Sequence, residues 1–499
     1  MIDYHALAPE LILAVTVLAV LVTDLVVRSK VWVAVVALVG LFAAFVPILT
    51  LAFCEPLVGC TEVTRTMFLG SYVVDSYALV LKGLFIGTAF VAVLLSVDYI
   101  ESDRYYEGEY FFLLLSAALG AVVMSSARDF VSIVVALELV SGPGFLLAGW
   151  RKADERSNEA ALKFFISGVL ALALLMFGVS LVYGLTGTQQ FDQLAAASVQ
   201  FVDLPLFTIG VLFILVGFGF KVSAVPFHYW TPDTYQGSPT PVTAWLAVGS
   251  KTAGFVGLLS IAFIAFPAMR DVWGPILWVV AAVTMVVGNV VAIKQTNIVR
   301  LLGYSSIAHA GFILAPFAAM AGASDAAMSQ AFYAAVAYLL IYAVMNLGAF
   351  GVVIAGLSKV ESAELTDWSG LFRHSPGLAV LLAGFFFSLA GIPPLAGWFA
   401  KLAMFQATIG SGTPWGYSIA VIAVLNSVVA IYYYAKPVKS AFFDEVPEGV
   451  SAAATPSVAS PALKLALGLS IAGVVLLGIF PGLVAQLSRY TSEIIAAIF

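Results

Sequence analysis

Charged residues are scarce in this chain. Only 10% of its 499 residues are Asp, Glu, Lys or Arg, whereas 62% are hydrophobic, and the mean hydropathy is +1.05. Soluble domains usually carry about 25% charged residues, so the composition excludes an ordinary soluble protein. The sequence also has no basic stripe with interleaved aromatic residues, which excludes a nucleic-acid-binding protein. We therefore expect a protein that crosses a membrane many times.

The chain also has only two cysteines and no nucleotide-binding motif. Cys54 and Cys60 share one loop, and two cysteines are too few for the usual zinc or iron–sulfur ligand set. They can form a disulfide if the loop faces an oxidising compartment, which the sequence leaves open. The glycines of 217–221 lie in an apolar run with no strand before them, so they are no phosphate loop. We expect no cofactor and no metal on this chain.

Apolar runs of about 20 residues recur along the whole sequence. They predict an all-α polytopic membrane protein with about fourteen transmembrane helices. Arg28 and Lys30, and not a small-residue cleavage site, follow the first run, so we expect this run to span the membrane and not to be a cleaved signal peptide. The runs are centred near residues 17, 42, 87, 118, 139, 172, 213, 252, 284, 310, 343, 393, 424 and 474.

Lys and Arg are distributed unevenly over the connecting loops. If both termini lie outside the cell and the loops alternate, 13 basic residues fall in cytoplasmic loops and 4 in extracytoplasmic loops. The positive-inside rule therefore predicts extracytoplasmic termini. In the cytoplasmic loop 359–376 we expect a short interfacial helix, because Leu365, Trp368, Leu371 and Phe372 recur at helical spacing.

Five lysines fall inside the predicted spans. A lysine at the bilayer centre costs about 3 kcal/mol or more, so it is rarely present there without a function. Glu138 is the only acid clearly in the middle of a span, and His309 is also mid-span. The five lysines are Lys82, Lys163, Lys221, Lys251 and Lys401.

Prolines interrupt two of the lysine-bearing spans. Pro226 should break its span just after Lys221, and Pro393-Pro394 should break another just before Lys401. Broken helices with buried charge are typical of ion transporters. The recurrence of a lysine next to a proline break also predicts two inverted five-helix repeats, 109–264 and 275–436. An N-terminal three-helix segment (1–108) precedes them, and a cytoplasmic loop with a C-terminal helix (437–499) follows them.

The buried charges suggest a proton path. A carboxylate near a lysine stabilises the ammonium, so we interpret Glu138 as a switchable counter-ion of Lys221, in preference to one half of a static ion pair. Lys163, on the next span, could also pair with Glu138. His309 can relay protons, although a lone buried histidine is more often structural.

The remaining polar candidates are less clear. His228, just past the Pro226 break, fits proton uptake and a structural role equally well. Lys82, near the start of its span, is as compatible with snorkelling to the membrane surface as with function. We interpret Tyr432–Tyr434 and 111–115 as lipid-facing or interfacial.

Four segments of the chain resemble one family. They read PFHYWTPDTYQGSPTPVTAWLAVGSKTAGF (226–255), VALELVS (135–141), GYSSIAHAGF (303–312) and GIPPLAGWFAKL (391–402). They are similar to the antiporter-like subunits of respiratory complex I, and TPDTYQGSPTPVTA with Lys401 resembles subunit N most. The second half departs from the pattern, since Ser305 stands where the first half has Glu138.

The resemblance implies a proton-translocating subunit of a bacterial NADH–quinone oxidoreductase in the plasma membrane. It implies Glu138 and Lys221 as a coupled pair, Lys251 and His309 as a connecting axis, and Lys401 as the terminal proton site. NADH, FMN, iron–sulfur clusters and quinone would bind other subunits, and the partners would be the membrane subunits M, L, K, J, A and H. The alternative is a subunit of a multisubunit cation/proton antiporter.

Overall fold

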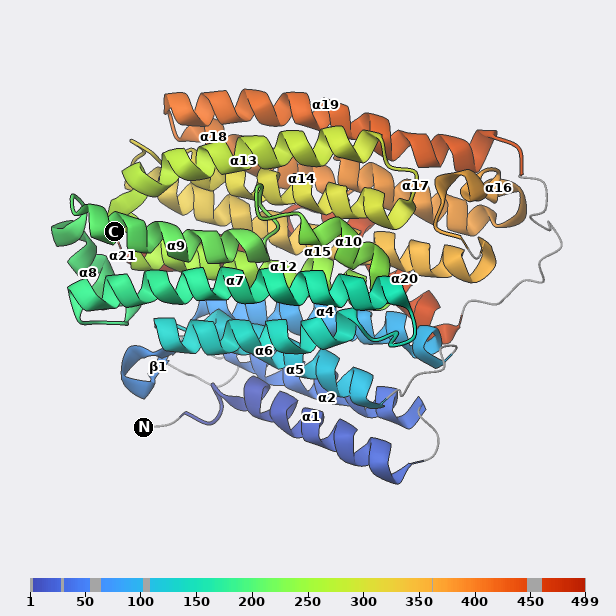
Figure 1. Ribbon diagram of the computed structural model, residues 1–499, viewed down its shortest axis with the longest axis horizontal. Coiled ribbons are helices and arrows are strands. Elements are labelled where there is room, and N and C mark those ends of the chain that lie inside the picture. Colours follow the sequence, from blue (N-terminus) through green and yellow to red (C-terminus); the bar gives the residue numbers. More distant parts are fainter. Residues whose placement is uncertain are drawn as a thin grey trace.

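A computed structural model gives the structure of residues 3–27, 31–53, 64–101, 108–360, 362–446 and 460–498; Cys54 and Cys60 lie outside these ranges. The described residues are almost all helical, and most helices run along the long axis of the molecule (Figure 1). One antiparallel hairpin, β1 (Arg65–Met67) and β2 (Tyr72–Val74), lies at one end of this bundle. We call this end the hairpin end.

Twelve helices of the described ranges are long and apolar enough to cross a membrane. Eleven are built on one α-helix each, one of which (α13) is preceded within its span by the turn η4 (Pro267–Met269). The twelfth is a composite of α11 (Thr240–Trp245), the π-helical turn η2 (Leu246–Ser250), α12 (Lys251–Leu259) and the π-helical turn η3 (Ser260–Ala265). The eleven are α1 (Ala8–Val26), α2 (Val31–Ala52), α4 (Ser76–Glu101), α5 (Gly108–Ser126), α6 (Phe130–Ala148), α7 (Glu155–Thr186), α13 (Arg270–Ile293), α14 (Ile298–Ala318), α15 (Asp325–Val360), α19 (Pro414–Phe443) and α20 (Pro461–Ile479).

Two further spans are interrupted where the prolines predicted. The first consists of α9 (Pro205–Lys221) and α10 (Trp230–Gly237), and the second of α17 (Pro376–Ala390) and α18 (Gly397–Gly410). In each, the apolar half-helix is too short to cross a bilayer alone. Together with the twelve long spans they confirm the prediction of about fourteen spans with discontinuous helices near Pro226 and Pro393.

The shorter elements lie between the spans. α8 (Phe191–Phe201) and η1 (Phe68–Gly70) are in connecting segments, and the amphipathic α21 (Gly482–Ile498) follows α20. The expected interfacial helix in 359–376 is only partly correct. Instead of one helix there are two separate turns, η5 (Leu365–Trp368) and α16 (Leu371–His374), because Gly370 between them has φ +67°.

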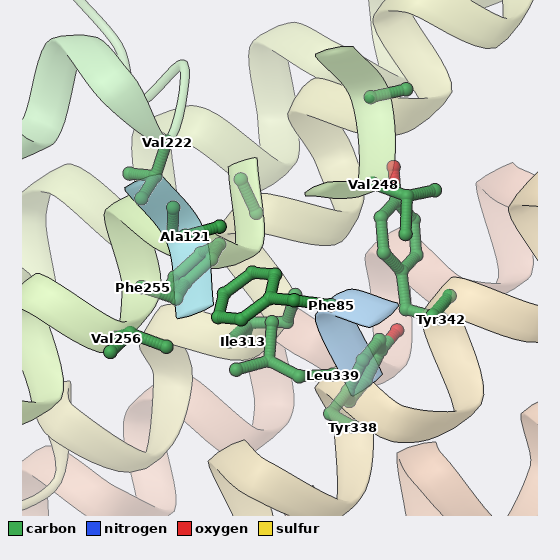
Figure 2. Close-up of a cluster of buried hydrophobic side chains, with 14 of the residues drawn as sticks. Phe85, Ala121, Val222, Val248, Phe255, Val256, Ile313, Tyr338, Leu339 and Tyr342 are labelled. Carbon is green, nitrogen blue, oxygen red and sulfur yellow. The ribbon is translucent and has the colours of Figure 1, made fainter. Parts of the chain in front are cut away.

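The composite helix from α11 to η3 is the centre of the bundle. Its most apolar 18-residue stretch is completely buried, as is most of α14 and α15, whereas only a third of the same stretch of α7 is buried. Figure 2 shows a hydrophobic cluster at this centre, in which Phe255 and Val256 of α12 lie near Phe85 of α4 and Ile313 of α14. The central helix also carries Lys251, so this lysine is surrounded by protein and not by lipid.

Candidate functional site

Lys221 is the last residue of α9, directly before the break. The side chain is buried, and Nζ donates a hydrogen bond to Ser141 Oγ at 2.8 Å. Glu138 lies one turn before Ser141 on α6, so both face the same side of that helix. The charges of Glu138 and Lys221 act on each other, although no ion pair closer than 4.0 Å joins these two described residues. Lys221 therefore has a neutral direct partner and a carboxylate close by.

Hydrogen bonds between backbone and side-chain groups stabilise the break itself. Trp230 Nε1 donates to the carbonyl oxygen of Phe220 at 3.2 Å, and the backbone N–H of Val225 donates to Thr284 Oγ1 at 2.9 Å. These bonds satisfy backbone groups that the proline frees from the helix. The interruption next to Lys221 is thus a fixed part of the fold.

Lys251 lies where the π-helical turn η2 returns to an α-helix. Its Nζ donates to Ser306 Oγ at 2.5 Å and to the carbonyl oxygen of Ser306 at 2.9 Å. The Tyr342 hydroxyl also donates to Ser306 Oγ, at 2.9 Å. Single π turns inside α-helices occur frequently at functional sites, and this one places Lys251 against α14.

His309 lies one turn after Ser306 on α14 and is bonded through both ring nitrogens. Nδ1 is 2.9 Å from the Tyr338 hydroxyl, and Nε2 is 3.1 Å from the Tyr434 hydroxyl, which also bonds Ser305. The charges of Lys401 and Lys251 both act on His309. The interpretation of Tyr433 and Tyr434 as lipid-facing is wrong, because both are buried; only Tyr432 is exposed. Residues 111–115 are likewise largely buried.

Lys401 follows the second break, in the second turn of α18. Nζ donates to the carbonyl oxygen of Ala390 at 2.7 Å and lies 5.1 Å from the centre of the Phe312 ring. Phe312 is three residues after His309 on α14, so the two sites share a helix face. At the other end, the Lys221 stem packs against Gly254, three residues after Lys251 on α12. Lys221, Lys251, His309 and Lys401 therefore form a row of buried polar sites.

Lys163 and His228 lie apart from this row. Lys163 Nζ is 2.6 Å from Glu159 Oε1 and 2.7 Å from Asp233 Oδ2, so the alternative pairing of Lys163 with Glu138 is not found. Asp233 also binds Arg300 Nη1 at 2.8 Å. His228 is half-buried within the break between α9 and α10.

The environment of Lys82 differs most from what the sequence indicated. This lysine is completely buried, and its Nζ is 2.7 Å from Glu10 Oε1, so it does not snorkel. Glu10 was not a candidate because it lies only a few residues into its span. An acid within an apolar run and a lysine in a nearby run could have suggested the pair, but their contact depends on how α1 packs against its neighbours.

A family model described as "NADH:quinone oxidoreductase/Mrp antiporter, TM" matches residues 127–427. The chain is 41% identical to NADH-quinone oxidoreductase subunit N 2 of Streptomyces griseus, over 92% of this chain and 87% of that protein. The chain belongs to the subunit N family. It is also 36% identical to NADH-quinone oxidoreductase subunit N of Trichlorobacter lovleyi, over 99% of this chain and 98% of that one.

Solved structures agree with this membership of the subunit N family. A chain of respiratory complex I from Thermus thermophilus with bound aureothin has a TM-score of 0.76 and 31% identity, and the match covers 96% of this chain and 98% of that chain. A chain of the Mrp complex from Dietzia has a TM-score of 0.84 but only 20% identity, with complete coverage of both. The second likeness shows a shared fold and nothing more.

Gly254→Ala should impair the site through packing alone. A Cβ at Gly254 would lie 2.9 Å from Lys221 Cγ and 3.0 Å from Val222 Cγ1, so the Lys221 stem would have to move away from Ser141. We expect proton pumping by the assembled complex to fall severalfold, measured in membrane vesicles. Gly142→Ala is the control, because nothing lies within 4 Å of its added Cβ and the gain in helix propensity is the same. Equal pumping by the two variants would contradict the proposed contact.

Proposed function

We propose that this chain carries protons across the membrane as the subunit N component of an NADH–quinone oxidoreductase. The observation that supports this most is Lys221, a buried lysine at the end of a broken helix, with a serine as its direct partner and the Glu138 carboxylate nearby. Such an ammonium can lose its proton when the carboxylate moves or is neutralised. Redox energy is used elsewhere in the complex, and this chain has no redox centre of its own.

The proton route follows the row of buried groups. In the first half-channel, 109–264, Glu138 modulates Lys221. Lys251 and His309 connect this half to the second, 275–436, where Lys401 is the terminal site. Ser306, Tyr342, Tyr338 and Tyr434 complete the connection, since hydroxyl groups both accept and donate protons.

Lys163 and His228 are the proposed uptake residues of the first half-channel. The Lys163 side chain is 43% exposed and shares Asp233 with Arg300, so it can exchange protons with water. His228 is half-buried in the segment that joins α9, which ends at Lys221, to α10, which carries Asp233. Segments 1–108 and 437–499 flank the half-channels and belong to neither.

The assignment implies partners that the single chain does not contain. We propose that it packs against the other membrane subunits of the complex, namely the antiporter-like M and L and the smaller K, J, A and H. NADH, FMN, the iron–sulfur clusters and the quinone would bind in other subunits.

A cation/proton antiporter subunit is the second candidate, because the fold is shared with a chain of the Mrp complex. The two functions differ in their need for Na⁺. A bare cation requires a set of oxygen ligands in place of its water. Lys221 and Lys401 donate to only one hydroxyl and one carbonyl oxygen, and Glu138 near Lys221 is a single carboxylate. We expect NADH-driven proton transport in vesicles at full rate without added Na⁺. Strict Na⁺ dependence would favour the antiporter.

The proposed orientation places the hairpin end outside the cell and the termini on the same side, in a bacterial plasma membrane. The test uses single cysteines in a Cys54→Ser/Cys60→Ser background. Thr366→Cys, on the exposed turn η5, should react with a membrane-impermeant reagent only from the cytoplasm, and Leu69→Cys, which is 94% exposed at the hairpin, only from outside. Labelling with the sides exchanged would reverse the orientation.

A further inference from the structure

A second buried lysine–glutamate pair lies outside both half-channels. Lys82 on α4 is 0% exposed, and its Nζ is 2.7 Å from Oε1 of Glu10 on α1. The Tyr72 hydroxyl accepts a hydrogen bond from Nζ at 3.4 Å, and the Tyr72 ring lies 5.3 Å from it. Neither Glu10 oxygen has a well-aligned hydrogen bond within the described part of the chain. The pair is therefore close but incompletely satisfied.

Stability does not account for such a pair. Removing two charges from water costs several kcal/mol per ion, and a well-packed apolar pair at the same place is often as stable or more so. The cost is recovered only with good geometry and additional hydrogen bonds, and within the described part of the chain the Glu10 carboxylate interacts with only Lys82 and the Tyr72 hydroxyl. An ion pair with these properties needs a role other than holding α1 against α4.

Polar groups connect this pair with the central helix that carries Lys251. The Tyr77 hydroxyl, on α4, donates to the carbonyl oxygen of Val256 at 3.2 Å. Val256 is five residues after Lys251 on α12, and Thr252 and Ser260 lie about one turn to either side of it. The Thr252 hydroxyl is buried and has no hydrogen-bond partner among the described residues, whereas the buried Ser260 hydroxyl interacts with the Tyr77 hydroxyl. A buried hydroxyl without a partner usually binds internal water.

A buried ion pair continues the connection towards the hairpin end. Arg128 Nη2 is 2.7 Å from Asp75 Oδ2, and the guanidinium lies 5.5 Å from the centre of the Tyr77 ring. The charges of Asp75 and Arg128 both act on Lys82. Ser126, two residues before Arg128, is buried, and its hydroxyl interacts with the Tyr72 hydroxyl. Each step between α12 and Glu10 thus has a polar group.

The geometry points to Glu10 and Lys82 as a proton-binding pair through which protons leave this chain at the hairpin end, after they have passed Lys251. This rests on the proposed function. A proton that arrives converts the Glu10 carboxylate to the carboxylic acid and breaks the attraction to the Lys82 ammonium. When the acid gives one proton to water at the hairpin end, the O–H bond breaks and the ion pair forms again. One proton leaves for each that arrives, and no other bond changes.

The neutral double variant Glu10→Gln/Lys82→Met separates this role from a structural one. Either single change leaves a charge or an amine without its partner, whereas the double change removes both charges at nearly constant volume. A structural pair predicts that the double variant assembles and pumps normally. An exit pair predicts that it assembles, oxidises NADH, and loses at least half of the pumping that Lys221→Ala removes. The measurement is protons moved per NADH by the whole complex in vesicles.

The Lys221→Ala variant distinguishes a failure of the exit pair from a failure of the proposed function. If it pumps poorly and the double variant pumps normally, the exit pair is overturned and the proposed function stands. If Lys221→Ala pumps normally, the proposed function fails and the exit pair fails with it. If both lose pumping, the triple variant should lose no more than the worse of the two, because both sites lie on one route.

A second measurement covers a double variant that does not assemble. Infrared difference spectra of the native complex, taken between the resting and turnover states, should contain a carboxylic acid carbonyl band from Glu10. Glu10→Asp should shift this band and Glu10→Gln should remove it. Unchanged spectra in both variants would overturn the proposal.

Discussion

Lys221→Ala should cut redox-driven proton pumping severalfold while the complex still assembles. The reason is that Lys221, at the first break, donates a hydrogen bond to Ser141 and interacts with the charge of Glu138. A positioned proton-transfer group contributes about 100-fold or more to its step, and alanine offers no replacement. The measurement is the number of protons moved per NADH oxidised, corrected for assembled complex.

Substitutions at Glu138 should lower proton pumping to different degrees. Glu138→Ala should lower pumping as Lys221→Ala does, because the ammonium loses the charge that modulates it. Glu138→Asp should be milder, since it keeps the charge and only shortens the reach. Ser141→Ala is the matched control one turn from Glu138. It removes the hydrogen bond that Ser141 accepts from Lys221 but removes no charge. Full pumping by an assembled Lys221→Ala or Glu138→Ala complex would rule out the pair.

Lys401→Arg and Lys401→Ala should both lose pumping. Arginine keeps the positive charge but does not release its proton at any working pH. If Lys401 only neutralised its surroundings, arginine would retain activity and alanine would not. Because we assign Lys401 as a proton carrier that exchanges with the His309 region, neither substitution can replace it.

The control for this experiment is the exposed Lys464, where both substitutions should leave pumping unchanged. The amount of assembled complex must be measured as well, because the Lys401 stem packs closely against Gly391. Near-normal pumping with arginine at position 401 would exclude the carrier role.

The spans and their two interruptions could be predicted from the sequence because both are local properties. Twenty apolar residues have the length of a bilayer, and a proline removes a backbone donor wherever it occurs. The location of Lys221 and Lys401 next to the two breaks could be read directly from their distance in sequence to Pro226 and Pro393. The same reasoning identified Lys251 and His309 as buried.

The pairing of polar groups could not be predicted in the same way. Hydropathy shows that a helix is buried but not how it is rotated, and rotation decides that Lys163 meets Asp233 and that Tyr434 meets His309. Lys82 and Glu10 are 72 residues apart in sequence, and α1 had to be placed beside α4 before their contact could be seen. Contacts of this kind depend on tertiary packing alone.

Among the described residues no acidic side chain forms an ion pair with Lys401, and the end of a helix supplies negative charge in its place. The carbonyl oxygen that accepts its hydrogen bond belongs to Ala390, the last residue of α17, and Lys221 is itself the last residue of α9. The carbonyl end of a helix carries roughly half a negative charge from its macrodipole. Each lysine therefore lies at the negative pole of a half-helix, and interrupting a span creates such a pole inside the membrane. In the proposed second half-channel we expect this backbone charge to take the place of a carboxylate, so that side-chain substitutions that keep the helix would leave it in place.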